Sequence, residues 1–160
     1  MMLKKRDNAP DFETTTQSGQ KFKLSDQKGK KIVLYWYVKD NTKGCQAESA
    51  SFRDRYSEFQ ENGIEVFGIA PGSEKTHKNF KEKNNLPFPL LLDENHEIAE
   101  KYGVWQKKKM YGREYMGIQR TTFLIDEDGK IDDIFGPGGV AKVKTKEHAD
   151  QIIEHWNLSL

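Results

Sequence analysis

Cysteine is almost absent from this sequence, with Cys45 the single example among 160 residues. One cysteine cannot form a disulfide within the chain or build a zinc site from several thiolates, which excludes both kinds of scaffold. The four histidines, at positions 77, 96, 148 and 155, follow no common metal-ligand spacing. We therefore expect them scattered on the surface and predict no metal and no cofactor. A lone free thiol fits a reducing compartment, which predicts a cytoplasmic location.

Long apolar runs and an excess of one charge are missing as well. The longest apolar run, residues 32–38, is far shorter than the roughly 20 residues that span a bilayer. No apolar segment follows the basic N-terminus, so we expect no membrane partner and no signal peptide. The 26 Lys and Arg nearly balance the 25 Asp and Glu, which predicts no binding of nucleic acid. Aromatic residues make up 11% of the chain, which argues against disorder, and the length predicts one domain over residues 1–160.

Strand-like and helix-like patterns alternate along the chain. We expect strands at residues 21–24, 32–38, 64–70, 90–92, 121–125 and 130–135, and helices at about 45–60, 74–83, 93–102 and 145–156. The run at 32–38 is typical of a central strand buried on both faces, and Asp128-Gly129 indicates a hairpin turn. The three lysines at 107–109 are expected in a solvated loop, and residues 136–139 in a flexible turn. This order predicts an α/β domain with a mixed β-sheet.

Cys45 follows the expected buried strand and a polar loop at 39–44, at the start of an expected helix. Ligand sites of open α/β sheets lie at the carboxyl ends of strands, which is where this cysteine falls. The positive end of a helix dipole favours the thiolate, the nucleophilic form of cysteine. Gly44 would let the backbone turn tightly, and the Thr42 hydroxyl would either cap the helix or face a small polar ligand. A buried, inert side chain is the alternative for a lone cysteine, but a position after a polar loop favours a reactive one.

Segments throughout the sequence resemble one family of thiol enzymes. Besides Glu48, the resemblance is carried by residues 9–12, 34–45, 52–54, 85–91, 102–105, 109–112, 116–118 and 120–126. The chain is similar to peroxiredoxins of the bacterioferritin-comigratory, or Q-type, subfamily. This resemblance implies a thioredoxin-like fold, with a central mixed β-sheet flanked by helices. It also implies a monomeric, thiol-dependent peroxidase that reduces hydrogen peroxide and organic hydroperoxides.

The resemblance also assigns roles to individual residues. It makes Cys45 the peroxidatic nucleophile, which becomes a sulfenic acid, and Thr42 the hydroxyl that hydrogen-bonds the peroxide. It makes Arg120 the guanidinium that reaches the thiolate from a distant strand, although a surface salt bridge is the alternative. Backbone N–H groups near Gly44 and Cys45 would help to stabilise charge on the leaving oxygen. Glu48 matches a glutamate of the first helical turn, where complementation of the helix dipole would explain it as well as a role in the network.

Three positions depart from the family pattern. Val38 stands where the active-site motif has a proline that shields the sulfur, and it restores a backbone N–H. Lys43 also replaces a usual proline, and it either favours the thiolate or faces water. Ala50 occupies the position where related proteins often carry a second cysteine. We therefore predict a one-cysteine enzyme whose sulfenic acid is reduced by an external thiol, either thioredoxin or glutaredoxin with glutathione.

Two other functions remain open on the sequence alone. If Val38 marks a decayed pocket, the protein is a thioredoxin-like binding module whose Cys45 reacts slowly with peroxide. Alternatively, it is a redox sensor that reacts fast but forms a mixed disulfide with one target instead of turning over. The rate of reaction with peroxide separates the first function from a peroxidase, and steady-state turnover with a thioredoxin system separates the second.

Overall fold

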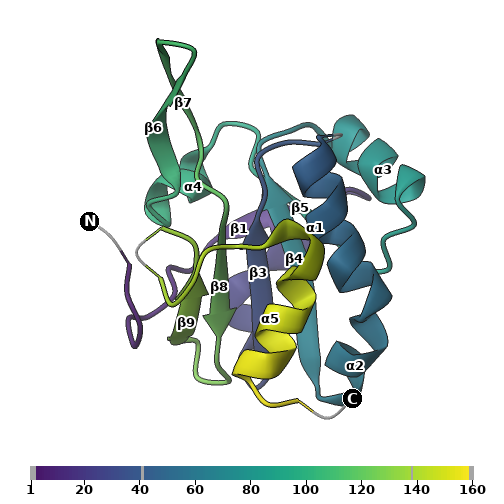
Figure 1. Ribbon diagram of the computed structural model, residues 1–160. Helices are drawn as coiled ribbons and strands as arrows, with labels where there is room; N and C mark the ends of the chain where they lie inside the picture. The colour runs from purple at the N-terminus through teal and green to yellow at the C-terminus, as the bar shows by residue number, and fades with distance from the viewer. Residues whose placement is uncertain (1–2, 41, 138, 159–160) are drawn as a thin grey trace.

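One strand, buried on both faces, lies at the centre of the molecule. In the computed structural model this strand is β3 (Lys31–Trp36), which pairs in parallel with β4 (Ile64–Ala70) and antiparallel with β8 (Thr121–Ile125). With β5 (Leu90–Leu92) beyond β4 and β9 (Ile131–Phe135) beyond β8, the sheet has the order β5-β4-β3-β8-β9 (Figure 1). The predicted α/β architecture with a central mixed sheet is therefore confirmed.

The structure describes residues 3–40, 42–137 and 139–158. Asn41, in the polar loop expected before the cysteine, and Gly138, in the expected glycine-rich turn, lie outside these ranges. Within the described part of the chain, no helix is both long enough and apolar enough to cross a membrane.

Helices lie on both faces of the central sheet. They are α1 (Lys43–Asp54), α2 (Tyr56–Glu61), α3 (Glu74–Lys83), α4 (Glu97–Lys101) and α5 (His148–His155), with 3-10 helices at Leu24–Gln27 and Thr145–Glu147. Two small two-stranded sheets are formed by β1 (Glu13–Thr15) with β2 (Lys21–Lys23) and by β6 (Trp105–Met110) with β7 (Arg113–Ile118). Helices α1 and α5 cover one face of the central sheet, while β1 and α4 lie behind it (Figure 1).

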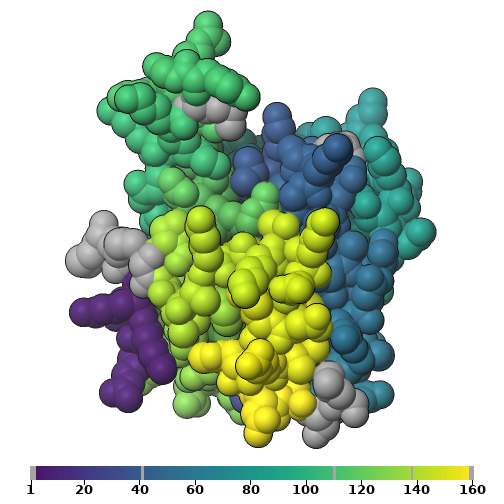
Figure 2. All heavy atoms as spheres, in the orientation of Figure 1, coloured from purple at the N-terminus to yellow at the C-terminus, as the bar shows by residue number. Residues whose placement is uncertain are grey.

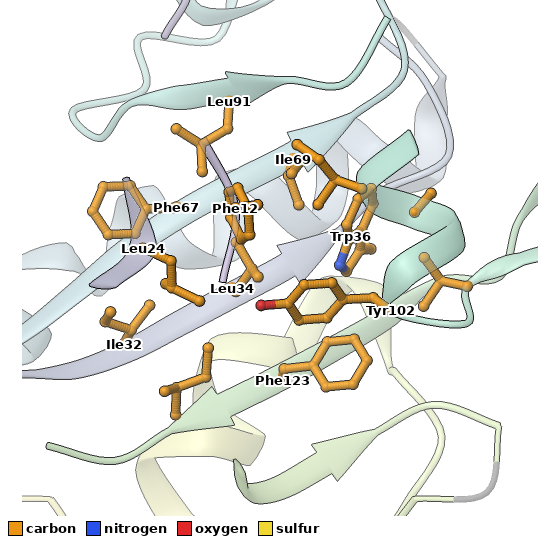
Figure 3. Packing of buried hydrophobic residues seen from close by; sticks show 14 of the residues in the cluster. Phe12, Leu24, Ile32, Leu34, Trp36, Phe67, Ile69, Leu91, Tyr102 and Phe123 are labelled. Atoms are coloured by element: carbon orange, nitrogen blue, oxygen red, sulfur yellow. The ribbon is translucent and has the colours of Figure 1, made fainter. Parts of the chain in front are cut away.

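Side chains alternate along β3 between two separate hydrophobic cores. Leu34 and Trp36 point into the core shown in Figure 3, where they meet Phe12, Tyr102 and Phe123. Tyr35, between them in the sequence, points the other way, toward the helices. The helix-side core is completed by Cys45, Phe52, Phe59, Phe80 and Ile152. Cys45 is therefore part of a packed interior as well as the start of a helix.

Several elements have the predicted bounds. The strands at 64–70, 90–92 and 121–125 and the helix at 74–83 occupy the expected residues. Ser73 begins that helix with a capping box, in which its hydroxyl accepts the Thr76 N–H at 3.1 Å. Gly129 adopts a φ of +80° in the turn between β8 and β9, as the Asp128-Gly129 pair predicted.

Other predicted bounds are wrong. The helix expected at 45–60 begins at Lys43 and is broken at Arg55, with φ −116° and ψ 12°, into α1 and α2. The break leaves Phe52 and Phe59 in contact, with ring centroids 5.9 Å apart, so the apolar periodicity carries no sign of it. The helix expected at 93–102 is reduced to α4, because His96 adopts a left-handed φ of 51° just before it. The helix expected at 145–156 starts as a 3-10 turn, and the strand expected at 32–38 ends at Trp36.

The solvated loop expected around the lysines at 107–109 is also wrong. These residues belong to an antiparallel hairpin of β6 and β7, joined by Tyr111 and Gly112 at φ +52° and +77°. A two-residue turn with positive φ at both positions matches the twist of the strands. Tyrosine is an unusual residue for such a turn, so the sequence did not indicate the hairpin. It rises from the main sheet (Figure 1), and a notch in the outline separates it from the start of α1 (Figure 2).

The histidines are not scattered on the surface as expected, because His77 and His148 are fully buried. The His77 Nδ1 lies 2.8 Å from Asp40 Oδ2, and its Nε2 lies 2.9 Å from the Leu91 carbonyl oxygen. The ring is therefore held between the Asp40 carboxyl and the backbone of β5. This buried contact fixes the loop that leads from β3 to α1.

Candidate active site

Thr42 caps the N-terminus of α1. Its backbone is extended, with φ −92° and ψ 151°, and its hydroxyl oxygen accepts the Cys45 N–H at 3.3 Å. Of the two expectations for Thr42, helix capping is present in the structure. Because the oxygen acts as an acceptor here, its O–H proton is available for a second partner. Cys45 itself lies in the first turn of α1, beyond the carboxyl end of β3, as its sequence position predicted.

The sulfur of Cys45 lies in the interior, since the residue has no exposed surface. Val38, in the position of the motif proline, is half-buried and packs against the same core. Lys43 is exposed, so of its two expected placements the one facing water is found. Ala50 is half-buried within α1. A molecule that reacts with Cys45 must therefore reach a sulfur that is covered by its surroundings.

Arg120 bridges Cys45 and Glu48 from the two-residue link between β7 and β8. Its Nη2 lies 3.4 Å from the Cys45 Sγ, and its Nη1 donates to Glu48 Oε1 at 2.7 Å. Only 20% of the Arg120 side chain is exposed and none of Glu48, so the alternative of a surface salt bridge is wrong. Burial lowers the pKa of Arg120, but Glu48 and Cys45 more than offset this and hold that pKa above its ordinary value.

We expected Gly44 to allow a tight turn of the backbone. The structure shows instead that its missing side chain makes room for Arg120. Gly44 lies inside α1 rather than before it. A Cβ added at Gly44 would lie 3.1 Å from the Arg120 Nη2, which is too close without movement of the guanidinium. The sequence could not reveal this reason, because Arg120 is distant along the chain.

Glu48 lies in the second turn of α1, not in the first as expected, because the helix begins at Lys43. The helix dipole acts mainly within the first turn, so Arg120 is the main partner of this carboxyl. Burial raises the pKa of Glu48 from 4.5 to about 7, although Arg120 acts in the opposite direction. Its Oε2 is buried and has no hydrogen-bond partner among the described residues.

His148, at the start of α5, is a site residue that sequence reasoning missed. Its Nε2 lies 2.7 Å from Thr122 Oγ1 and 3.9 Å from Glu48 Oε2. Burial lowers the pKa of His148 to about 4, so the ring is neutral at pH 7. One signal was available: His148 precedes the buried Ile152 by four residues and shares its apolar helix face.

Lys108 completes the surroundings from the hairpin. Its Nζ donates to the Ile118 carbonyl oxygen at 2.8 Å, and burial together with the charge of Arg120 lowers its pKa. Across the described ranges, no three His, Cys, Asp or Glu side chains gather closely enough to hold a metal ion. The site thus surrounds one sulfur with a guanidinium, a hydroxyl and the N-terminus of a helix. Such a set stabilises a thiolate and negative charge on an oxygen that leaves it.

Comparison with known proteins gives concordant matches. A model of the AhpC/TSA family matches residues 6–134. Peroxiredoxin Bcp of Bacillus subtilis is 47% identical over 146 residues, covering 91% of this chain and 90% of the relative. Peroxiredoxin Bcp of Escherichia coli is 38% identical over 154 residues, covering 96% and 95%. Among solved structures, a mutant of peroxiredoxin Q from Xanthomonas campestris has a TM-score of 0.83, with 31% identity and 91% and 90% coverage.

A mutant of Xylella fastidiosa PrxQ gives a TM-score of 0.88, at 27% identity, and covers 98% of this chain and 96% of its own. The expected thioredoxin-like fold is thus confirmed, and the family model extends over most of the sequence. The chain therefore belongs to the AhpC/TSA family, in which it is a thiol-dependent peroxidase, a peroxiredoxin of the Bcp or Q type.

Proposed function

We propose that this peroxiredoxin reduces hydrogen peroxide and organic hydroperoxides at Cys45 and that an external thiol recycles it. The observation that carries the proposal is the contact of 3.4 Å between Arg120 Nη2 and Cys45 Sγ, at the capped N-terminus of α1. A nearby cation and the positive end of a helix both favour the thiolate, which is the form that attacks a peroxide.

In the first step, the Cys45 thiolate attacks the terminal oxygen of the hydroperoxide in line with the O–O bond. An S–O bond forms, the O–O bond breaks, and Cys45 becomes a sulfenic acid. The leaving oxygen takes up a proton and departs as water or an alcohol. Arg120 stabilises the charge that develops on this oxygen, and Thr42 donates its hydroxyl proton to the bound peroxide.

In the second step, an external thiol attacks the sulfenic sulfur. A mixed disulfide forms with loss of water, and a second thiol equivalent then releases reduced Cys45 and a disulfide. The chain has one cysteine, with Ala50 where related proteins often have another, so no internal thiol competes for the sulfenic acid. The sulfenic acid therefore persists until the external thiol arrives, and excess peroxide converts it to sulfinic acid.

The family defines the reactants as a hydroperoxide and a thiol reductant. The alkyl peroxide reduction activity of the Xanthomonas campestris bacterioferritin comigratory protein, 30% identical with a TM-score of 0.83, has been examined in trapped intermediate and ligand complexes. We extend that substrate class to this chain. As reductant we propose thioredoxin, with glutaredoxin and glutathione as the second candidate. We propose further that the enzyme is monomeric and cytoplasmic.

The first experiment mixes fully reduced protein with one equivalent of hydrogen peroxide. Tryptophan fluorescence gives the rate and intact mass gives the product. We expect fast addition of one oxygen, absent in Cys45→Ser and slower by about 100-fold in Arg120→Ala. A rate no better than that of a free thiol would refute the proposal.

Recycling is tested separately, by steady-state turnover with thioredoxin, its reductase and NADPH. Sustained turnover is the expected result. A stable mixed disulfide without turnover would replace the peroxidase cycle by a sensor function.

A further inference from the structure

Cys45 and Glu48 compete for a single cation. Both acids are fully buried, and the Arg120 guanidinium contacts both, through Nη2 and Nη1. If both acids were ionised, two negative charges would share the one guanidinium that contacts both, in a poorly solvated site, which is unfavourable. One proton therefore stays with this cluster near neutral pH. The reaction requires it to lie on Glu48, because the thiolate is the nucleophile.

We propose that His148 is the positioning residue that keeps this proton on Glu48, and that the Arg120 guanidinium is thereby left to the Cys45 thiolate. The proposal rests on the proposed function, in which the Cys45 thiolate is the reacting group.

The hydrogen bonds around His148 determine its tautomer. Gln151 Oε1 accepts the Lys144 N–H at 3.0 Å, and Gln151 Nε2 donates to the Lys142 carbonyl oxygen at 3.0 Å, which sets the orientation of the amide. The same Oε1 lies 2.8 Å from His148 Nδ1, so Nδ1 carries the ring proton. The Nε2 of a neutral His148 is left with a lone pair.

Two oxygens compete for this lone pair, Thr122 Oγ1 at 2.7 Å and the unpartnered Oε2 of Glu48. His148 Nε2 and Glu48 Oε2 are 3.9 Å apart, and both are acceptors if the carboxyl is ionised. Two buried acceptors that face each other are stabilised when one of them gains a proton. A protonated Oε2 reaches Nε2 after a shift of about 1 Å, while Oε1 still accepts from Arg120. Without that proton, the Thr122 hydroxyl is the donor to Nε2, at 2.7 Å.

The burial of the two groups supports this assignment. Burial raises the pKa of Glu48 to about 7 and lowers that of His148 to about 4, so the carboxyl takes the proton before the imidazole does. Three other titratable groups act on the cluster, Tyr35 on β3, Tyr37 just after it and Lys108 on β6. Both tyrosines stay neutral because burial raises their pKa values well above 10. Lys108 adds positive charge near the sulfur and cannot accept the proton as a cation.

His148→Phe removes the lone pair and keeps an aromatic ring at the site. The His148 ring makes edge contacts with Phe52 and Phe135, with centroids 5.4 Å apart in both cases, and the new ring can occupy that space. We expect the proton to move from Glu48 to Cys45. The single-turnover rate with hydrogen peroxide should then fall about tenfold at neutral pH and recover in part at alkaline pH. The ultraviolet absorbance of the thiolate should fall in parallel.

The mechanism is tested by making His148→Phe in a Glu48→Gln protein. The glutamine amide carries no negative charge, so it does not draw Arg120 away from the thiolate. If His148 acts through Glu48, the tenfold effect of His148→Phe and its pH dependence should disappear in the Glu48→Gln protein. An equal loss in both backgrounds, or no loss in either, overturns the proposal. Thiolate absorbance needs no peroxide, so it tests the position of the proton even if the peroxidase function itself fails.

Gln151→Met is the second variant, in case His148→Phe does not fold. It removes the acceptor of the Nδ1 proton, so the proton can move to Nε2 and donate to the Glu48 carboxylate. The expected result is again a slower reaction and less thiolate at neutral pH, abolished by Glu48→Gln. The same loss in both backgrounds would overturn the role of His148.

Discussion

At the scale of single residues, Gly44 and Arg120 constrain each other by contact. Gly44→Ala places a methyl group about 3.1 Å from the Arg120 Nη2, so the guanidinium must move by a few tenths of an ångström. The same change favours the helix by up to about 1 kcal/mol. We therefore expect the single-turnover rate with hydrogen peroxide to fall about tenfold, while the free energy of unfolding does not fall. Stopped-flow fluorescence and urea unfolding measure the two quantities.

The control for this prediction is Gly44→Ala in an Arg120→Ala background. The rate effect of the methyl group should vanish there, because the side chain that it displaces is gone. A loss of stability together with the loss of rate would indicate general damage to α1 and would contradict the contact argument.

The residues of the site differ in how visible they are in the sequence. Cys45, Thr42 and Arg120 lie in segments with a recognisable order, and the structure brings all three together. Their catalytic roles remain predictions. Two contacts could not be seen in the sequence, that of Gly44 with Arg120 and that of Glu48 with His148. Both join residues that are far apart along the chain. No local pattern encodes such distances.

At the scale of elements, a buried contact between His77 and Asp40 holds the loop between β3 and α1. The side chains of His77 and Asp40 are 0% and 6% exposed, and Tyr37 donates a hydrogen bond to Asp40 Oδ1 at 2.9 Å. Asp40→Asn keeps the shape of this partner but replaces its carboxyl by an amide, which weakens the hydrogen bond to His77. We expect the free energy of unfolding to fall by about 1 to 3 kcal/mol in urea. Tyr37→Phe, which keeps the contact between His77 and Asp40, is the control and should cost less; equal losses would refute the role of that contact.

The β6–β7 hairpin carries an avoidable strain at its tip. Tyr111 is 98% exposed and adopts a φ of +52°, which costs a tyrosine about 1 kcal/mol or more. Tyr111→Asn creates the Asn-Gly pair that this turn prefers. Amide hydrogen exchange of β6 and β7 should slow by about fivefold, whereas the midpoint of global unfolding should not move. Faster exchange in the hairpin would show that the tyrosine side chain stabilises the turn.

Elements were predictable where one short-range signal dominates. The central strands have continuous apolar runs, α3 has a complete cap, and the turn before β9 has an Asp-Gly pair. The break at Arg55 and the left-handed His96 interrupt helices without a change in the apolar pattern. The hairpin of β6 and β7 was missed because its turn uses a tyrosine where asparagine or glycine is usual.

At the scale of the whole molecule, folding at weakly acidic pH adds a proton to Glu48 and removes one from His148. The pKa of Glu48 rises from 4.5 to about 7 in the folded state, so its contribution to stability is lost as pH rises through that range. The pKa of His148 falls from 6.5 to about 4, so its contribution is lost as pH falls through that range. The two slopes oppose each other where they overlap, between pH 4.5 and 6.5. From these two groups we expect a nearly flat stability profile there.

Single variants should show separately how each group makes the free energy of unfolding depend on pH. In Glu48→Gln the free energy of unfolding should rise with pH across the range from 4 to 6.5, by about 3 kcal/mol. In His148→Phe it should instead fall as pH rises above 4.5, and the fall should end below pH 7, because Glu48 holds its proton less well without His148. Urea unfolding at a series of pH values measures both. Slopes of the same sign in the two variants would contradict the opposite protonation changes of Glu48 and His148.

Because the only thiol is buried, the rate at which it is labelled reports how often the structure around it opens. A thiol-reactive dye can label this chain at a single atom, the Cys45 sulfur, which has no exposed surface. Labelling must wait until the start of α1 opens, so its rate reports the frequency of that opening. The recycling thiol must reach the same buried sulfur after it has become a sulfenic acid. The labelling rate of the reduced protein therefore gives the opening rate against which the access of a large reductant to this sulfur can be compared.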